Sequence, residues 1–255
     1  MIVIKTERDL QLMRPACELA GTVLDEVAAF IKPGVTTREV DEFAAARMKG
    51  YGAKSAFLGY RKYPCHTCVS VNEQVVHGMA GKRRLELGDI VSLDVGVKYN
   101  GFVGDTARTV AVGGCSILAQ RLMDVTEKSL FEGIAQAVVG NRIADISRAV
   151  QRYVEGNGFS VVREFVGHGV GRTMHEDPQI PNFVEKNKSS PELKPGMTLA
   201  IEPMVNAGKA GVEILNDGWT VVTKDGQLSA HFEHTVLVTE GAAEILTWPK
   251  KTPSK

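Results

Sequence analysis

The second half of this sequence repeats features of the first, and this echo constrains the fold more than any other feature. Four positions of the first half are matched 106 positions later in the second: Gly34, Val40, Gly50 and Gly52 by Gly140, Ile146, Gly156 and Gly158. Asp94 also ends the segment Leu87–Asp94, and Glu202 ends the similar segment Pro195–Glu202. A duplicated unit of two helices and a sheet would bring these two carboxylates together across a pseudo-two-fold axis. The alternative is a chance match between two helices that both end at glycine.

Helical patterns open each half. Apolar residues three and four apart predict four helices, over residues 6–31, 36–50, 117–139 and 143–156. Thr6 with Asp9, and Thr36 with Glu39, have the spacing of a capping box, which fixes where the first two helices begin. Strand-like stretches follow each pair of helices, to about Val112 and about Val238. The order of elements predicts an α+β protein.

The composition is that of an ordinary globular protein, with 44% hydrophobic residues, 24% charged residues and a formal net charge of zero. A neutral chain has no general attraction to nucleic acid or to an anionic membrane. No apolar run approaches the roughly 18 residues that a membrane span needs, and the N-terminus is too charged for a signal peptide. Four cysteines are too few for a disulfide framework. We therefore expect a cytoplasmic monomer.

The two halves are expected to form one domain. No Pro/Ser-rich linker separates them, and their boundaries fall at about 6–112 and 117–238. We therefore predict a single domain over residues 1–255, internally duplicated.

Two aspartates lie on the two strands of a predicted hairpin, one on each side of its turn. Asn100-Gly101 is a favoured two-residue turn, and pairing around it sets Asp94 opposite Ala107, two residues from Asp105. Both carboxylates then project from one face as diagonal neighbours, with their Cα atoms about 7–8 Å apart. Because an unpaired charge is costly in an apolar run such as that around Asp94, the two acids call for a cation. The alternatives are solvated acids, or an ion pair with the nearby Arg108.

Three residues of the second half also interrupt or end strand-like stretches: His168, Glu202 and Glu233. Each alone is more often a hydrogen-bonded core residue than a ligand. Together with the two aspartates they make four carboxylates and one imidazole, which suit two divalent transition ions. A hydroxide between such ions is a nucleophile at neutral pH. No nucleophile-elbow, Walker or dinucleotide-binding motif offers another chemistry.

The sequence resembles the type I, bacterial-like methionine aminopeptidases from its first helix to about Thr239. The motifs that carry the resemblance are Ser70–Gly78 (SVNEQVVHG), Asp94 and Asp105 eleven positions apart, Gly167–Pro178 (GHGVGRTMHEDP), Ile201–Pro203 (IEP) and Phe232–Thr235 (FEHT). The resemblance implies the creatinase-like pita-bread fold, a duplicated α+β arrangement with a curved antiparallel sheet covered by helices. This expectation agrees with the internal echo.

The resemblance also implies a function. A metalloexopeptidase of this family removes the N-terminal methionine from new proteins and peptides with a small second residue, by means of a hydroxide held between two metal ions. The implied partners are the N-termini of nascent polypeptides, with transient contact to the ribosome. The ligand chemistry leaves cobalt, manganese, iron and zinc open.

Individual residues receive roles from the same resemblance. The implied metal ligands are Asp94, Asp105, His168, Glu202 and Glu233, with Asp105 and Glu233 bridging the ions. Glu202 would also activate the water and shuttle its proton. His77 and His175 would contact the substrate and stabilise the tetrahedral intermediate without binding metal. The implied methionine pocket consists of Phe57, Tyr60, Tyr63, Cys68 and Trp219, for which simple core packing is the alternative.

The sequence departs from the family pattern at one position and contains one further motif. Met174 stands where the family often has an aromatic residue, and a flexible methionine can fill that space. Cys65 and Cys68 have the spacing of half a zinc site, but no second cysteine pair accompanies them.

Three rival assignments remain less favoured. Xaa-Pro aminopeptidases and prolidases share the ligand order but usually carry a long N-terminal domain. Type II methionine aminopeptidases usually have a helical insertion between the third and fourth ligands, where this chain has only 34 positions between His168 and Glu202. A metal-free binding homologue would be expected to lack some of the five ligands.

Overall fold

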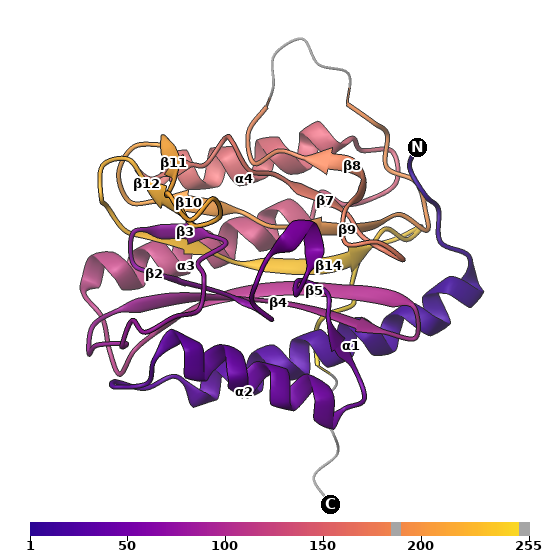
Figure 1. Ribbon diagram of the computed structural model, residues 1–255. Coiled ribbons are helices and arrows are strands. Elements are labelled where there is room, and N and C mark those ends of the chain that lie inside the picture. The colour runs from indigo at the N-terminus through magenta and orange to yellow at the C-terminus, as the bar shows by residue number, and fades with distance from the viewer. Residues whose placement is uncertain (185–189, 250–255) are drawn as a thin grey trace, which may run out of the picture.

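The computed structural model describes residues 1–184 and 190–249, and a large antiparallel sheet runs through it (Figure 1). Its strand order is β1-β4-β5-β14-β9-β7-β8, with β2 also pairing β4 and β15 also pairing β14. The bounds of these strands are β1 Lys54–Ser55, β2 Cys68–Val71, β4 Ile90–Tyr99, β5 Phe102–Ala111, β7 Gly167–Gly169, β8 Glu176–Ile180, β9 Thr198–Ile201, β14 Glu233–Leu237 and β15 Glu244–Ile245.

Two three-stranded sheets lie beside the large one, with the orders β13-β10-β6 and β11-β12-β3. Their strands are β3 Gln74–Val76, β6 Ser160–Val161, β10 Met204–Asn206, β11 Val212–Ile214, β12 Val221–Thr223 and β13 Ser229–His231.

The described residues form four α-helices and one 3₁₀ turn: α1 Glu7–Phe30, α2 Thr37–Gly50, η1 Tyr60–Lys62, α3 Ile117–Ile134 and α4 Ile143–Gly156. The capping boxes predicted at Thr6 and Thr36 are present, each with reciprocal side-chain to backbone hydrogen bonds. No helix among residues 1–184 and 190–249 is long and apolar enough to cross a membrane.

The helix predicted over 117–139 was wrong at its end, because α3 stops at Ile134. Beyond it the amides of Gln136 and Ala137 donate to carbonyls three residues back, which tightens the chain into a turn. Ala137 is fully buried in the core that α3 and α4 share. The apolar spacing that suggested a longer helix is therefore satisfied by a buried turn.

Each pair of helices covers its own part of the large sheet. Buried side chains of α1 and α2 pack on β2 and β4, whereas those of α3 and α4 pack on β9 and β14. At Gly104 of β5 an added Cβ would lie only 2.5 Å from the Cα of Cys17, so α1 approaches the sheet there because no side chain intervenes. The next residue, Asp105, projects from the opposite face. The helices thus lie on one face and leave the other for the acidic residues.

The arrangement of the strands supports the prediction that the chain is internally duplicated. The helices α2 and α4 begin and end 106 positions apart, as the sequence echo requires. The strands β5 and β14 meet at the centre of the sheet, and β4 and β9 flank them as their outer neighbours. Asp94 lies on β4 and Glu202 directly follows β9, so the two matched carboxylates approach the centre from opposite sides.

Candidate metal centre

The first two acids lie where the predicted hairpin sets them. In the pairing of β4 with β5, Asp94 is opposite Ala107 and Asp105 is opposite Gly96. Asn100 and Gly101 have φ angles of 50° and 79°, the left-handed conformation that a tight hairpin turn requires. The expected register and the shared face of the two aspartates are therefore confirmed.

Small residues separate the acids of the first half from those of the second. Ala107 is paired with Asp94 on one side and with Glu233 on the other, so these three side chains form a row on one face. On the next strands, His168 is paired with Ala200. Because alanine fills little space, the longer side chains around Ala107 and Ala200 can converge over them.

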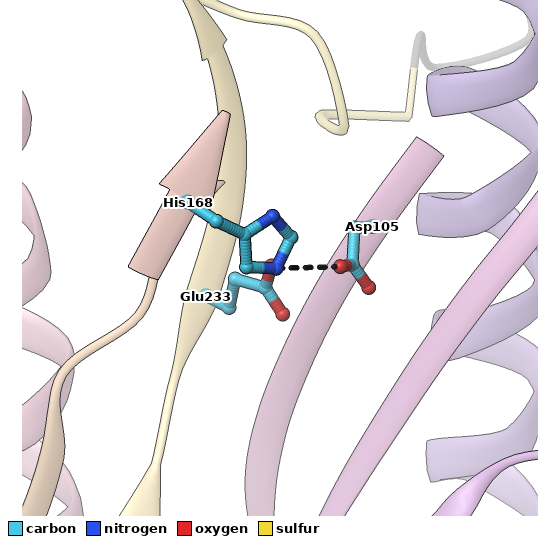
Figure 2. Close-up of side chains that lie close together, drawn as sticks. All are labelled: Asp105, His168 and Glu233. Atoms are coloured by element: carbon cyan, nitrogen blue, oxygen red, sulfur yellow. Dashed lines mark ion pairs between the residues drawn. The ribbon is translucent and has the colours of Figure 1, made fainter. Parts of the chain in front are cut away.

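The acidic side chains and the imidazole come together in space. The Nε2 atom of His168 lies 3.6 Å from Oδ2 of Asp105 and 3.4 Å from Oε1 of Glu202. One ligand atom each from Asp105, His168 and Glu233 lies within 4.8 Å of the others, although the three come from different strands (Figure 2). Asp94 lines the same cavity. All five predicted ligands are thus in one place.

Unpartnered atoms indicate that this cluster fits a cation. Buried oxygens of Asp94, Asp105 and Glu233 have no hydrogen-bond partner, which is costly unless a positive charge compensates them. The Nδ1 atom of His168 lies 2.9 Å from the carbonyl oxygen of Gly169. Because a carbonyl only accepts, Nδ1 carries the proton, and the lone pair of Nε2 faces the acids. Oxygen donors with one imidazole suit divalent transition ions.

Burial controls the charge of the cluster. It raises the pKa of Asp94 to about 7. It also raises the pKa values of Asp105, Glu202 and Glu233 well above the usual range, with repulsion among the carboxylates as the second cause. Burial lowers the pKa of His168 to about 3, so this ring is neutral. Four carboxylates cannot all be charged here without a cation, and a bound metal ion reverses this balance.

The acids form the floor of a cavity of about 130 Å³ whose walls are largely aromatic. All five predicted pocket residues line it: Phe57, Tyr60, Tyr63, Cys68 and Trp219. The rings of Tyr63 and Trp219 meet edge to face with centroids 5.0 Å apart. Met174 also lines this cavity, as expected for a residue that takes the place of an aromatic wall.

Two histidines stand over the cavity. His77 follows β3 with a φ of 58°, a conformation that few residues other than glycine adopt and that is frequent at functional sites. Its ring meets that of Phe165 edge to face at 5.5 Å, and burial with the nearby His175 lowers its pKa to about 4. The ring of His175 stacks on Tyr60 at 5.2 Å. Burial and the charge of Arg61 lower its pKa as well.

The ion pair considered for Arg108 was wrong. Its guanidinium pairs instead with Asp25 of α1, on the helix side of the sheet. The alternation of side chains along β5 explains this outcome, because Arg108 is an odd number of residues from Asp105 and points to the other face. Neither Asp94 nor Asp105 is therefore neutralised by arginine.

Sequence reasoning missed two residues of the site. His231 is buried, and its Nε2 lies 3.8 Å from Oε2 of Glu202 without a hydrogen-bond partner. Its position two residues before Glu233 was a usable signal, since such residues share a face of a strand. Arg61 lines the cavity from η1, and nothing in the local sequence marks it.

Comparison with known proteins shows which family this chain belongs to. Residues 11–240 match metallopeptidase family M24. The chain is 51% identical over 247 residues to methionine aminopeptidase 1 of Bacillus subtilis, covering 97% of this chain and 99% of that protein. It is equally identical, with the same coverage, to the methionine aminopeptidase of Clostridium perfringens.

A solved structure agrees. The crystal structure of methionine aminopeptidase from Thermotoga maritima matches with a TM-score of 0.94 and 47% identity, over 97% of this chain and 99% of that one. The predicted pita-bread fold is therefore confirmed, and the family implies that the protein uses divalent metal. The chain belongs to metallopeptidase family M24, and within that family to the methionine aminopeptidases.

Proposed function

We propose that this enzyme removes the N-terminal methionine from polypeptides whose second residue is small. One observation carries the proposal. A single small cavity joins the buried acids and His168 to the aromatic walls and to both auxiliary histidines. A methionine side chain between the aromatic residues would hold the scissile bond over the acidic floor.

Five residues would hold the metal: Asp94, Asp105, His168, Glu202 and Glu233. We propose that they would hold two divalent ions, with Asp105 and Glu233 serving both, because eight carboxylate oxygens and one imidazole nitrogen outnumber the about six donors of one octahedral ion. Bound there, such ions would supply a Lewis acid for the carbonyl and would lower the pKa of water. Cobalt, manganese, iron and zinc all suit these donors.

The protein's own groups would move the proton and hold the substrate. Glu202 would accept the proton of the attacking water at a carboxylate oxygen and return it to the leaving amine, because it lines the same cavity as the other acids. Neutral His175 would donate a hydrogen bond to the scissile carbonyl as negative charge develops. His77 would position the substrate from the other wall.

The pocket explains the proposed preference for substrates. The predicted methionine pocket is apolar and mostly aromatic, and it is lined by Phe57, Tyr60, Tyr63, Cys68 and Trp219. The thioether group of methionine contacts aromatic rings favourably. The cavity that these residues line is small, with a volume of about 130 Å³. A bulky second residue would therefore meet the walls near His175. The natural substrates would be nascent polypeptides, met in the cytoplasm by a monomer in transient contact with the ribosome.

Peptide hydrolysis tests the proposal. Enzyme reconstituted with each metal in turn is given Met-Ala-Ser, Met-Leu-Ser and Ala-Pro-Ala, and released amino acids are measured. We expect rapid release of methionine from Met-Ala-Ser, at least tenfold slower release from Met-Leu-Ser, and none after chelation. A preference for Ala-Pro-Ala would contradict the proposal and assign the enzyme to the Xaa-Pro group. Metal analysis of protein purified without added metal would give the number and identity of the ions.

A further inference from the structure

Residue Lys5 of the N-terminal segment lies against the loop 171–175, which ends at His175, and against Glu176, the first residue of β8. The Nζ atom of Lys5 donates a hydrogen bond of 2.5 Å to Oε2 of Glu176. Both side chains are buried, with exposed fractions of 3% and 10%. A lysine is rarely buried unless it is paired. This ion pair joins residues 171 positions apart and has no part in the proposed metal site.

The carboxylate of Glu176 holds the loop from within. Its other oxygen, Oε1, accepts the backbone N–H groups of Arg172 at 2.9 Å and of Thr173 at 3.4 Å. Glu176 is also the residue directly after His175. One carboxylate therefore fixes both the start of the loop and the backbone next to the histidine.

Lys5 is itself held firmly. Its backbone N–H donates to the carbonyl oxygen of Gly196 at 2.8 Å, and its Nζ lies 3.4 Å from the carbonyl oxygen of Val3. Gly171 makes room for the pair, since a Cβ there would lie 2.6 Å from both Cε of Lys5 and Oε1 of Glu176. The N-terminal segment thus provides a fixed anchor for the loop.

We infer that the Lys5–Glu176 ion pair is a positioning device that sets the place of the His175 ring over the cavity. This inference rests on the proposed function of His175. A second ion pair also joins the N-terminal region to this loop, but it is more exposed to water. Arg172 pairs with Asp9 at 2.8 Å, and the exposed fractions of the two side chains are 62% and 24%. Water weakens such surface pairs. The buried pair is therefore the stronger of these two ties between the N-terminal region and the loop.

The substitution Lys5→Met tests the inference, with Arg172→Met as the matched control in the same loop. We expect Lys5→Met to lower kcat about 10–100-fold, the size of effect that a small misplacement of a catalytic group produces. The KM and the metal content should stay within about twofold of wild type. Arg172→Met should leave all three unchanged. The NMR signal of the His175 ring, identified by its loss in His175→Ala, should shift only in Lys5→Met.

Loss of one buried partner can unfold a protein, so the second variant removes both charges. Lys5→Met with Glu176→Gln leaves no unpaired buried charge, and the amide oxygen can still accept from Arg172. All assays are run well below the melting temperature of the least stable variant. We expect kcat of this double variant to stay lowered at least tenfold. A wild-type kcat in the double variant would overturn the inference.

A third comparison separates this inference from the proposed role of His175. If Lys5 acts through His175, adding Lys5→Met to His175→Ala should cost less than about twofold, because coupled residues are not additive. An equal loss in both backgrounds would show that Lys5 acts elsewhere. A normal Lys5→Met beside an impaired His175→Ala would overturn the inference alone, whereas full kcat in His175→Ala would overturn the proposed role as well.

Discussion

The two halves of the molecule contribute matching carboxylates through different kinds of structure. In the first half, Asp94 and Asp105 lie on the two strands of one local hairpin. In the second half, Glu202, Glu233 and His168 lie on or directly after three strands that are far apart along the chain. Local pairing is enough to make the first half of the site. The second half depends on the pairing of β9 with both β14 and β7, and the pairing of β5 with β14 brings the two halves together.

The halves also hold their histidines differently. His77 is fixed by its own backbone, in a left-handed conformation at the end of β3. His175 lies in a loop that a buried ion pair braces from the N-terminus. One ring is therefore placed by backbone geometry and the other by side-chain electrostatics. This difference can be tested by substitutions of graded effect.

The largest expected effect comes from removing one proposed ligand from each half. Asp94→Ala and His168→Ala should both lose metal affinity and activity together, and by more than the 10–100-fold typical of groups that only support ligands. If both halves of the chain supply ligands that the metal needs, the ligands of one half cannot replace a ligand lost from the other. Metal content and methionine release are measured on the same preparations. Full activity of either variant at saturating metal would break the equivalence of the halves.

The second effect concerns the histidine of the second half. His175→Ala should keep near-normal metal content but lose about 10²–10³ in kcat, the usual cost of one preorganised contact to a developing oxyanion. Metal stoichiometry, melting temperature and kcat on one preparation distinguish this role from a structural one. A lowered melting temperature with unchanged kcat would refute it.

A smaller effect is expected from the histidine of the first half. His77→Ala should lose about fivefold in kcat/KM, since losing one positioning hydrogen bond costs roughly 1 kcal/mol. Most of this loss should appear in KM, because His77 would bind the ground state and the transition state alike. A loss in kcat as large as that of His175→Ala would mean that the two rings share one role.

The sequence predicted the parts of the site that depend on local rules. The Asn100-Gly101 turn fixed the register of Asp94 and Asp105, and the capping residues fixed the starts of α1 and α2. Pairing between distant strands leaves no local pattern, so Glu202 and Glu233 were joined to the aspartates only through their residue types, the internal echo and the family resemblance. Arg61 and the Lys5–Glu176 pair were missed because no local pattern marks them. His231 was missed although strand alternation places it on the same face as Glu233. At the end of α3, a buried turn continued the apolar spacing of a helix.

The last prediction concerns how the stability of the fold, rather than its activity, depends on pH. Burial and the nearby His175 lower the pKa of His77 to about 4, against about 6.5 in the unfolded chain, and His231 faces it as well. Between these values the unfolded state binds more protons, so the contribution of His77 to stability is full above about pH 6.5 and is lost as the pH falls toward 4.

In His77→Asn, whose side chain does not titrate and tolerates a left-handed backbone, this loss is absent. The free energy of unfolding in urea should therefore fall less between pH 7 and 4.5 in the variant than in wild type, by on the order of 1–3 kcal/mol. Between pH 7 and 8.5, where the ring is neutral in both states, the two proteins should show the same slope. Identical slopes below pH 6.5 would mean that the His77 ring is not held neutral by burial.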